Sequence, residues 1–150
     1  MKLKNIVVAV DGSDASQEAL NYAVVLALQN NSSLKGFFII DRGWSDYIGN
    51  DWQSTQNARQ GFLDYIQTEQ EQQAEAARQQ FESAVDGIEV CNFMVLGGEP
   101  IEMLISTANA ADTDLFITGK RIFQVSGRPS LRDLGRRLAA KSTRPLMLFP

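Results

Sequence analysis

Short apolar runs alternate along this chain with stretches of helical periodicity. Residues 6–10 form a continuous apolar run rich in β-branched side chains, which is typical of a strand buried on both faces of a parallel sheet. After a polar turn at residues 11–14, apolar residues recur at helical spacing up to Asn30, where a helix is expected to end. The alternation continues through the chain, and it predicts a parallel sheet with crossover helices.

The pattern predicts a series of elements with no linker or internal repeat between them. Strands are expected at residues 6–10, 34–40, 88–96, 114–119 and 145–149, and helices at about residues 14–30, 57–85, 101–108 and 131–141. Residues 42–57 and 120–130 have no clear period and are predicted to be loops. The Gln-rich middle of the second helix is interpreted as a solvated face, because Gln and Glu are good helix formers. We expect one domain over residues 1–150.

Composition excludes several kinds of chemistry. The chain has no histidine, which removes His-based metal sites and the Ser-His-Asp and Cys-His forms of catalysis. Cys91 is the only cysteine, so it cannot form an intramolecular disulfide; we expect a small buried side chain, with a redox role as the alternative. No apolar run is long enough to cross a membrane or to act as a signal peptide. These features predict a soluble protein of the cytoplasm.

Charge and aromatic residues are unevenly placed. The net charge of −4 argues against sequence-independent binding to nucleic acid. Most of the basic residues lie between residues 120 and 144, but those arginines are equally explained by helix-terminus and surface charge, so a nucleic-acid partner is not expected. Trp44, Tyr47 and Trp52 cluster in the predicted loop 42–57. They indicate either a partner or lid surface or a loop folded back on the domain.

Four motifs occur in an order that resembles the universal stress protein family. The first strand ends in Val-Asp-Gly-Ser at residues 10–13, and a Gly-Glu-Pro turn follows the third strand at residues 98–100. The fourth strand ends on Gly119, and the last strand begins at Pro145. The resemblance covers the whole chain. It implies a Rossmann-like, doubly wound sheet of five parallel strands in the order 3-2-1-4-5.

Ligands of doubly wound sheets bind outside the carboxyl ends of the strands, where the winding reverses. That rule places Asp11, Ile40 and Gly119 around one crevice. In members of the family that bind nucleotides, the residue at the position of Asp11 contacts adenine or ribose. The alternative is that Asp11 only turns the chain, with Asp14 as the cap of the first helix.

The family's ATP signature, G-x2-G-x9-G-[ST] after the fourth strand, is largely lost here. Gly119 matches its first position, whereas Ile122, Arg132 and Asp133 depart from the other three. Asp133 is expected to cap the last helix, so that its carboxylate replaces a phosphate at the helix amides. ATP binding remains open in a non-standard form, because Lys120 and the arginines of the same loop could hold phosphates. The predicted nucleotide crevice consists of Asp11, Ile40, Gly119, Lys120, Arg132 and Asp133.

Two functions from different classes remain. The resemblance implies a non-enzymatic stress-response or regulatory protein, with unidentified protein partners and a homodimer formed through the last strand. The alternative is an ATP or AMP sensor, or a slow ATPase, that uses the basic loop. A third reading, an ATP-pyrophosphatase, is discounted because residues 11–16 lack its leading Ser and second Gly. No catalytic residue and no metal site is assigned.

Overall fold

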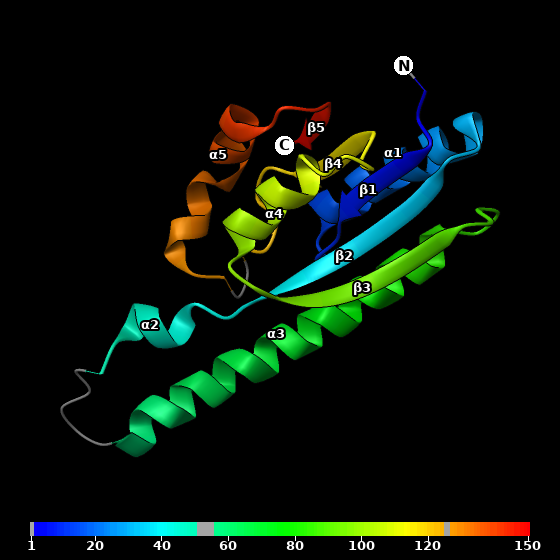
Figure 1. The fold of residues 1–150 in the computed structure, drawn as a ribbon. Coiled ribbons are helices and arrows are strands. Elements are labelled where there is room, and N and C mark those ends of the chain that lie inside the picture. Colours follow the sequence, from blue (N-terminus) through cyan, green and yellow to red (C-terminus); the bar gives the residue numbers. More distant parts are fainter. Residues whose placement is uncertain (1, 51–55, 125–126) are drawn as a thin grey trace.

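The computed structural model describes residues 2–50, 56–124 and 127–150 (Figure 1). Within these ranges five strands form one parallel sheet in the order β3-β2-β1-β4-β5, which confirms the predicted fold class and strand order. The strands are β1 (Asn5–Ala9), β2 (Ser33–Asp41), β3 (Cys91–Gly98), β4 (Leu115–Gly119) and β5 (Leu146–Phe149).

Helices cover both faces of the sheet. On one face lie α1 (Asp14–Asn30) and α3 (Gln56–Ala84), which contact each other; on the other face lie α4 (Pro100–Ala108) and α5 (Leu134–Lys141). Figure 1 shows that the first half of α3 extends beyond the sheet. No helix in the described ranges is long and apolar enough to cross a membrane.

The core lies between the sheet and these helices. Its largest buried side chains include Phe37, Phe38 and Phe116 from β2 and β4. Where α3 crosses β2, the ring of Phe81 lies directly over Gly36, and a Cβ at position 36 would meet that ring at 2.5 Å. A side chain at this position would therefore push α3 away from the sheet, because interiors are close-packed.

Residues 42–57 are not simply a loop, as the periodicity predicted. Trp44–Ile48 forms a short helix, α2. The reason is tertiary contact, which overrides weak local propensity: the ring of Trp44 packs edge-on against Phe62 of α3, and Arg59 of α3 donates to the carbonyl of Gly49 at 2.8 Å. This part of the segment is thus folded back on the domain. Trp52, the third aromatic residue of the predicted cluster, lies outside the described residues.

Three smaller expectations also need correction. β3 begins at Cys91 and not at residue 88. Cys91 is half-buried rather than buried. The cap of α1 is Ser13, whose Oγ accepts the N–H of Ser16 at 3.2 Å, while Asp14 is the first residue of the helix.

Candidate functional site

The carboxyl ends of β1 and β2 present two buried carboxylates, Asp11 and Asp41. Asp11 follows β1 directly, and its Oδ1 accepts the backbone N–H and the hydroxyl of Ser13 at 3.0 and 2.5 Å. Its Oδ2 accepts the backbone N–H of Phe123, from the loop after β4, at 3.1 Å. Both oxygens of Asp11 are therefore bonded to groups of the chain itself.

The turn after Asp11 is held by a glutamine of α3. Gln80 accepts the N–H of Gly12 and the hydroxyl of Ser16 at 3.1 and 2.9 Å, and its amide group donates to the carbonyl of Ser13 at 3.0 Å. Gly12 has a φ of 83°, which L side chains rarely adopt, and a Cβ there would lie 3.2 Å from that of Ala76. The Gly of the Val-Asp-Gly-Ser motif is thus required by the turn.

Asp41 ends β2 and is joined to the loop after β4 by an arginine. The Nε of Arg128 donates to the carboxylate oxygens of Asp41 at 2.8 and 3.0 Å, and its terminal nitrogen donates to Glu99 of the Gly-Glu-Pro turn. The side chain of Arg128 is 14% exposed. Burial acts to lower the pKa of Arg128, but the hydrogen bonds to Asp41 and Glu99 outweigh burial and raise the pKa above its ordinary value.

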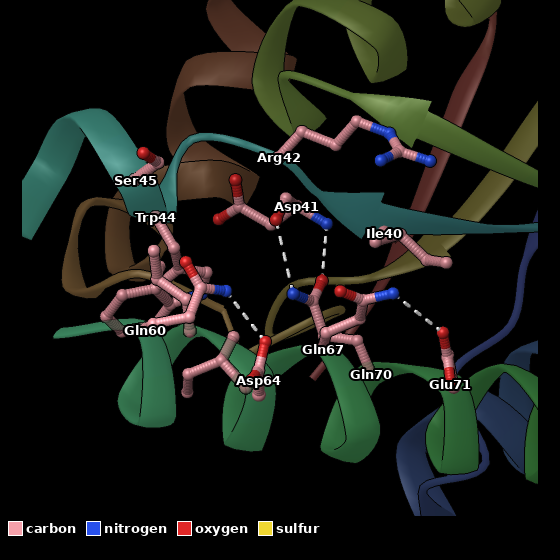
Figure 2. A pocket seen from close by; sticks show the side chains of 12 residues that line it. Ile40, Asp41, Arg42, Trp44, Ser45, Gln60, Asp64, Gln67, Gln70 and Glu71 are labelled. Atoms are coloured by element: carbon pink, nitrogen blue, oxygen red, sulfur yellow. Dashed lines mark hydrogen bonds between the residues drawn. The ribbon is translucent and has the colours of Figure 1, made fainter. Parts of the chain in front are cut away.

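A second glutamine of α3 holds the backbone at the end of β2, as Figure 2 shows. Gln70 is buried; its carbonyl oxygen accepts the N–H of Asp41 and its amide group donates to the carbonyl of Asp41 at 3.2 Å. Beside this pair is a cavity of about 300 Å³ between β2, α2 and α3, which Ile40 and Trp44 line. Gln60 and Gln67 on its rim are bonded to Asp64 and Glu71, one turn further along α3.

The centre of the predicted crevice is filled by the loop after β4. Ile122 and Phe123 are both buried, and the Phe123 ring packs edge-on against Phe38 at 5.3 Å and beside Phe37 at 6.5 Å between centroids. Phe123 has a φ of 64°, which is uncommon for a residue other than glycine. The surrounding contacts must hold this conformation, since it costs free energy by itself.

Apart from Arg128, the basic residues that follow β4 lie in a different place. Lys120, Arg121, Arg132 and Arg136 line a cavity of about 440 Å³ next to Leu148 of β5. Asp133 lines it too, but its side chain makes no cap hydrogen bond; it is exposed and lies 3.6 Å from Arg136. The expectation that Asp133 caps α5 in place of a phosphate is therefore wrong. Arg136, one turn into the helix, attracts the carboxylate away from the helix amides.

The structure divides the six predicted site residues into two groups. Asp11 and Ile40 lie at the ends of β1 and β2, whereas Lys120, Arg132 and Asp133 line the basic cavity beside β5. Gly119 ends β4 between the two groups, with Phe149 accepting the N–H of Lys120 at 2.8 Å. Within the described ranges, no group of three or more acidic or cysteine side chains could hold a metal ion.

Sequence reasoning missed four residues that shape this site: Asp41, Gln70, Gln80 and Phe123. Asp41 carried a usable signal, since it follows a buried strand at its carboxyl end just as Asp11 does. Gln70 carried one too, since it lies four residues after Ile66 and four before Ala74 on the apolar stripe of its helix. Arg128 was expected among the loop arginines that could hold phosphates, but it pairs with Asp41 and Glu99 instead.

The fold is that of a doubly wound α/β protein, with buried carboxylates at the carboxyl ends of β1 and β2. The sequence model of the Universal stress protein family matches residues 2–150. The chain therefore belongs to the universal stress protein family, as its ordered motifs indicated.

Solved structures of this family share the fold. The universal stress protein UspA from Lactobacillus plantarum matches with a TM-score of 0.72 and 18% identity, over 100% of this chain and 99% of its own. A universal stress protein in complex with cAMP matches with a TM-score of 0.62 and 20% identity, over 99% and 97%. One from Archaeoglobus fulgidus in complex with dAMP matches with a TM-score of 0.61 and 16% identity, over 100% of both chains. A search of the curated proteins finds no match.

Proposed function

We propose that this chain is a non-enzymatic regulatory protein of the stress response, whose nucleotide crevice is closed by its own loop. The observation that carries the proposal is the bond from the Phe123 N–H to Asp11, with the Phe123 ring buried against Phe37 and Phe38 of β2. A ligand that needs the Asp11 carboxylate would have to break this bond and displace the ring. The protein then acts through contacts with other proteins rather than through bound nucleotide.

Arg128 supports the same proposal. It binds Asp41 of β2 and Glu99 before α4, so it fastens the loop after β4 to two other strand ends. No hydrolytic centre is proposed: phosphoryl transfer needs a metal ion and a positioned water, and the buried carboxylates of Asp11 and Asp41 are already bonded to groups of the chain. The cytoplasm is the proposed location, in keeping with a single cysteine that forms no intramolecular disulfide.

We further propose a homodimer formed through β5. This strand is at one end of the sheet, so its outer side is available for pairing with a second copy. Its side chains are all half-buried, and Phe149 packs against the partly exposed ring of Tyr22 at 5.7 Å. Apolar residues beside an open strand edge favour association of this kind.

Calorimetric titration with ATP, cAMP and dAMP, each with and without magnesium, tests the closed crevice. Heats that stay at the level of dilution up to millimolar nucleotide, together with no release of phosphate from ATP, are expected. Micromolar binding that is lost in Asp11→Asn but kept in the matched variant Asp14→Asn would overturn the proposal. Asp14 is a suitable control because it is three residues away and belongs to the first turn of α1.

The alternative function, an adenine-nucleotide sensor, has its own supporting observation. Four cationic side chains line one cavity beside β5, and relatives of the same fold were crystallised with cAMP and dAMP. In this case nucleotide binding would be lost in Arg132→Gln but not in Arg78→Gln, which lies on α3 beside Phe93. Titration of both variants distinguishes the sensor from the closed protein.

A further inference from the structure

β3 is the outer strand at the end of the sheet opposite to β5. It pairs with β2 along its whole length, from Leu34 with Cys91 to Asp41 with Gly98. Alternate N–H and C=O groups point to the other side of the strand. Within the described part of the chain no strand pairs with that side, so a row of backbone groups is available to another strand.

The sequence of this edge supplies few of the usual protections, although two cations from other elements lie against the strand: Arg78 over the Phe93 ring and Arg42 at Gly97. Proteins guard exposed edge strands with charged residues, proline, bulges or short length. β3 has the sequence Cys-Asn-Phe-Met-Val-Leu-Gly-Gly, which contains no charged residue and no proline over eight residues. β5 is different: it has four residues and lies between Pro145 and Pro150. β3 is therefore the longer and less protected edge of this sheet.

Apolar side chains are exposed on both faces of β3, near its middle. Met94 and Val95 are each 36% exposed. Phe93 packs against Phe81 of α3, so the alternation of side chains places Val95 on the α3 face and Met94 on the opposite face. A second strand laid along this edge would cover both residues.

We propose that β3 pairs antiparallel with β3 of a second copy of this chain, about a twofold axis. A twofold axis brings each strand opposite itself, and such pairing is disfavoured where like charges meet. No residue of β3 is charged, so the strand's own side chains bring no like charges together in self-pairing.

The proposed contact between two β3 strands buries little surface, and this limits the affinity of the dimer. Eight paired residues span about 27 Å, and a strand edge of this length covers less than the roughly 800 Å² per partner of a stable interface. The β3 dimer is therefore weak and depends on protein concentration. It is separate from the proposed β5 dimer. If both edges pair, each copy has two interfaces that do not close, and species larger than a dimer form.

Substitution to lysine tests the pairing. A twofold axis through the middle of β3 places either Met94 or Val95 opposite its own copy, so the double variant Met94→Lys/Val95→Lys sets like charges against each other. The association constant is expected to fall at least about tenfold, a change of about 1.4 kcal/mol. The matched variant Met94→Glu/Val95→Glu, when it is the only protein present, is expected to lose association through β3 in the same way. An equimolar mixture of the two variants is expected to associate again, because opposite charges then meet.

Sedimentation velocity across a wide range of protein concentration gives the result. At high concentration, wild type is expected to form species larger than a dimer, whereas the Met94→Lys/Val95→Lys variant is expected to form a dimer only. Adding Met147→Lys in β5 to that variant is expected to leave a monomer. Should the β5 proposal fail, wild type stops at a dimer that the β3 substitutions dissolve and Met147→Lys does not. Tyr65→Lys, an exposed position of α3, is the control for an added charge.

Two outcomes overturn the β3 proposal. One is a lysine variant that sediments like wild type at every concentration. The other is a mixture of the lysine and glutamate variants that forms no species larger than each variant forms alone, although each keeps the thermal unfolding midpoint of wild type. That midpoint also guards against loss of folding, which is not expected because both substituted side chains are partly exposed.

Discussion

The backbone N–H of Phe123 donates to Oδ2 of Asp11 at 3.1 Å, and this bond joins two loops that are 112 residues apart in the chain. It satisfies the carboxylate that a ligand of the crevice would contact. The ring of Phe123 meanwhile packs on Phe37 and Phe38, so the same residue supplies the polar and the apolar closure of the crevice. The predictions below follow from this arrangement and from the contacts that support it.

At position 123, a glycine variant is expected to be more stable than an alanine variant, which is the reverse of the usual order of stability. Phe123→Ala is expected to lower the free energy of unfolding by about 3 to 5 kcal/mol, because a buried ring is lost. Phe123→Gly should be the more stable of the two by about 1 kcal/mol, since glycine adopts the positive φ of this position without strain. Urea unfolding of both variants checks the order. A glycine variant less stable than the alanine variant would show that this φ is not kept in solution.

Gln80 is expected to matter far more than its neighbour in sequence. Gln80→Ala removes three hydrogen bonds to the turn after β1 and leaves the hydroxyl of the buried Ser16 without its acceptor, at a cost of about 1 to 3 kcal/mol. Gln79→Ala is the matched control: Gln79 is exposed and bonds only to Glu75 on its own helix, so its loss should stay within about 0.5 kcal/mol. Equal effects in thermal or urea unfolding would contradict the role assigned to Gln80.

Arg128 and Asp41 should be strongly coupled. Arg128→Met leaves the buried carboxylate of Asp41 without its cation, and breaking a buried pair in this way costs about 3 to 5 kcal/mol. Asp41→Asn in the same chain removes the charge, so the double variant should be more stable than the sum of the single losses predicts, by about 1 to 3 kcal/mol. A double-mutant cycle in urea measures the coupling. Additive losses would mean that the pair contributes little.

Asp114 should make stability depend on pH at acid values. Hydrogen bonds from the N–H groups of Asn5 and Lys4, both 2.9 Å from its Oδ2, lower the pKa of Asp114 below its ordinary value. Because its pKa is lowered in the folded state, ionised Asp114 stabilises the fold fully at pH values above its unfolded-state pKa of about 4. This stabilisation is lost as the pH falls through the folded-state pKa.

Thermal unfolding midpoints at several pH values test this. Asp114→Asn should be less stable than wild type near neutral pH, and the difference should shrink as the pH falls below about 4. Asp112→Asn, at an exposed position two residues earlier, should show no such shrinking difference. A gap between wild type and Asp114→Asn that stays constant down to pH 2 would rule out the proposed titration.

Much of the fold could be predicted from the sequence because a parallel sheet leaves a strong pattern. Strands buried on both faces are short and apolar, and the helices between them carry apolar stripes. The pattern was weaker where an element depends on remote contacts. The α2 helix has only five residues and is held by Trp44 against Phe62 and by Arg59, none of which is a local signal.

The site was harder to predict than the fold. The rule for doubly wound sheets placed Asp11 at the right edge, but it could not show that Phe123 and Arg128 would reach the same edge from the far loop. Arg132 was grouped with Asp11 by the spacing of the family's signature, and Lys120 by its charge in the same loop. Their side chains line the cavity beside β5 instead, while Ile122 and Phe123 are buried.

The two glutamines of α3 have a consequence for how this chain can vary. Gln70 and Gln80 fix the helix to the ends of β2 and β1 by side-chain bonds, independently of the peptide that connects β2 to α3. These bonds fix α3 at two points of its own length, in addition to the contacts of α2 with its first half. A single residue inserted between the two glutamines turns one amide by about 100° relative to the other. An insertion there should therefore leave only one of the two strand ends attached to α3.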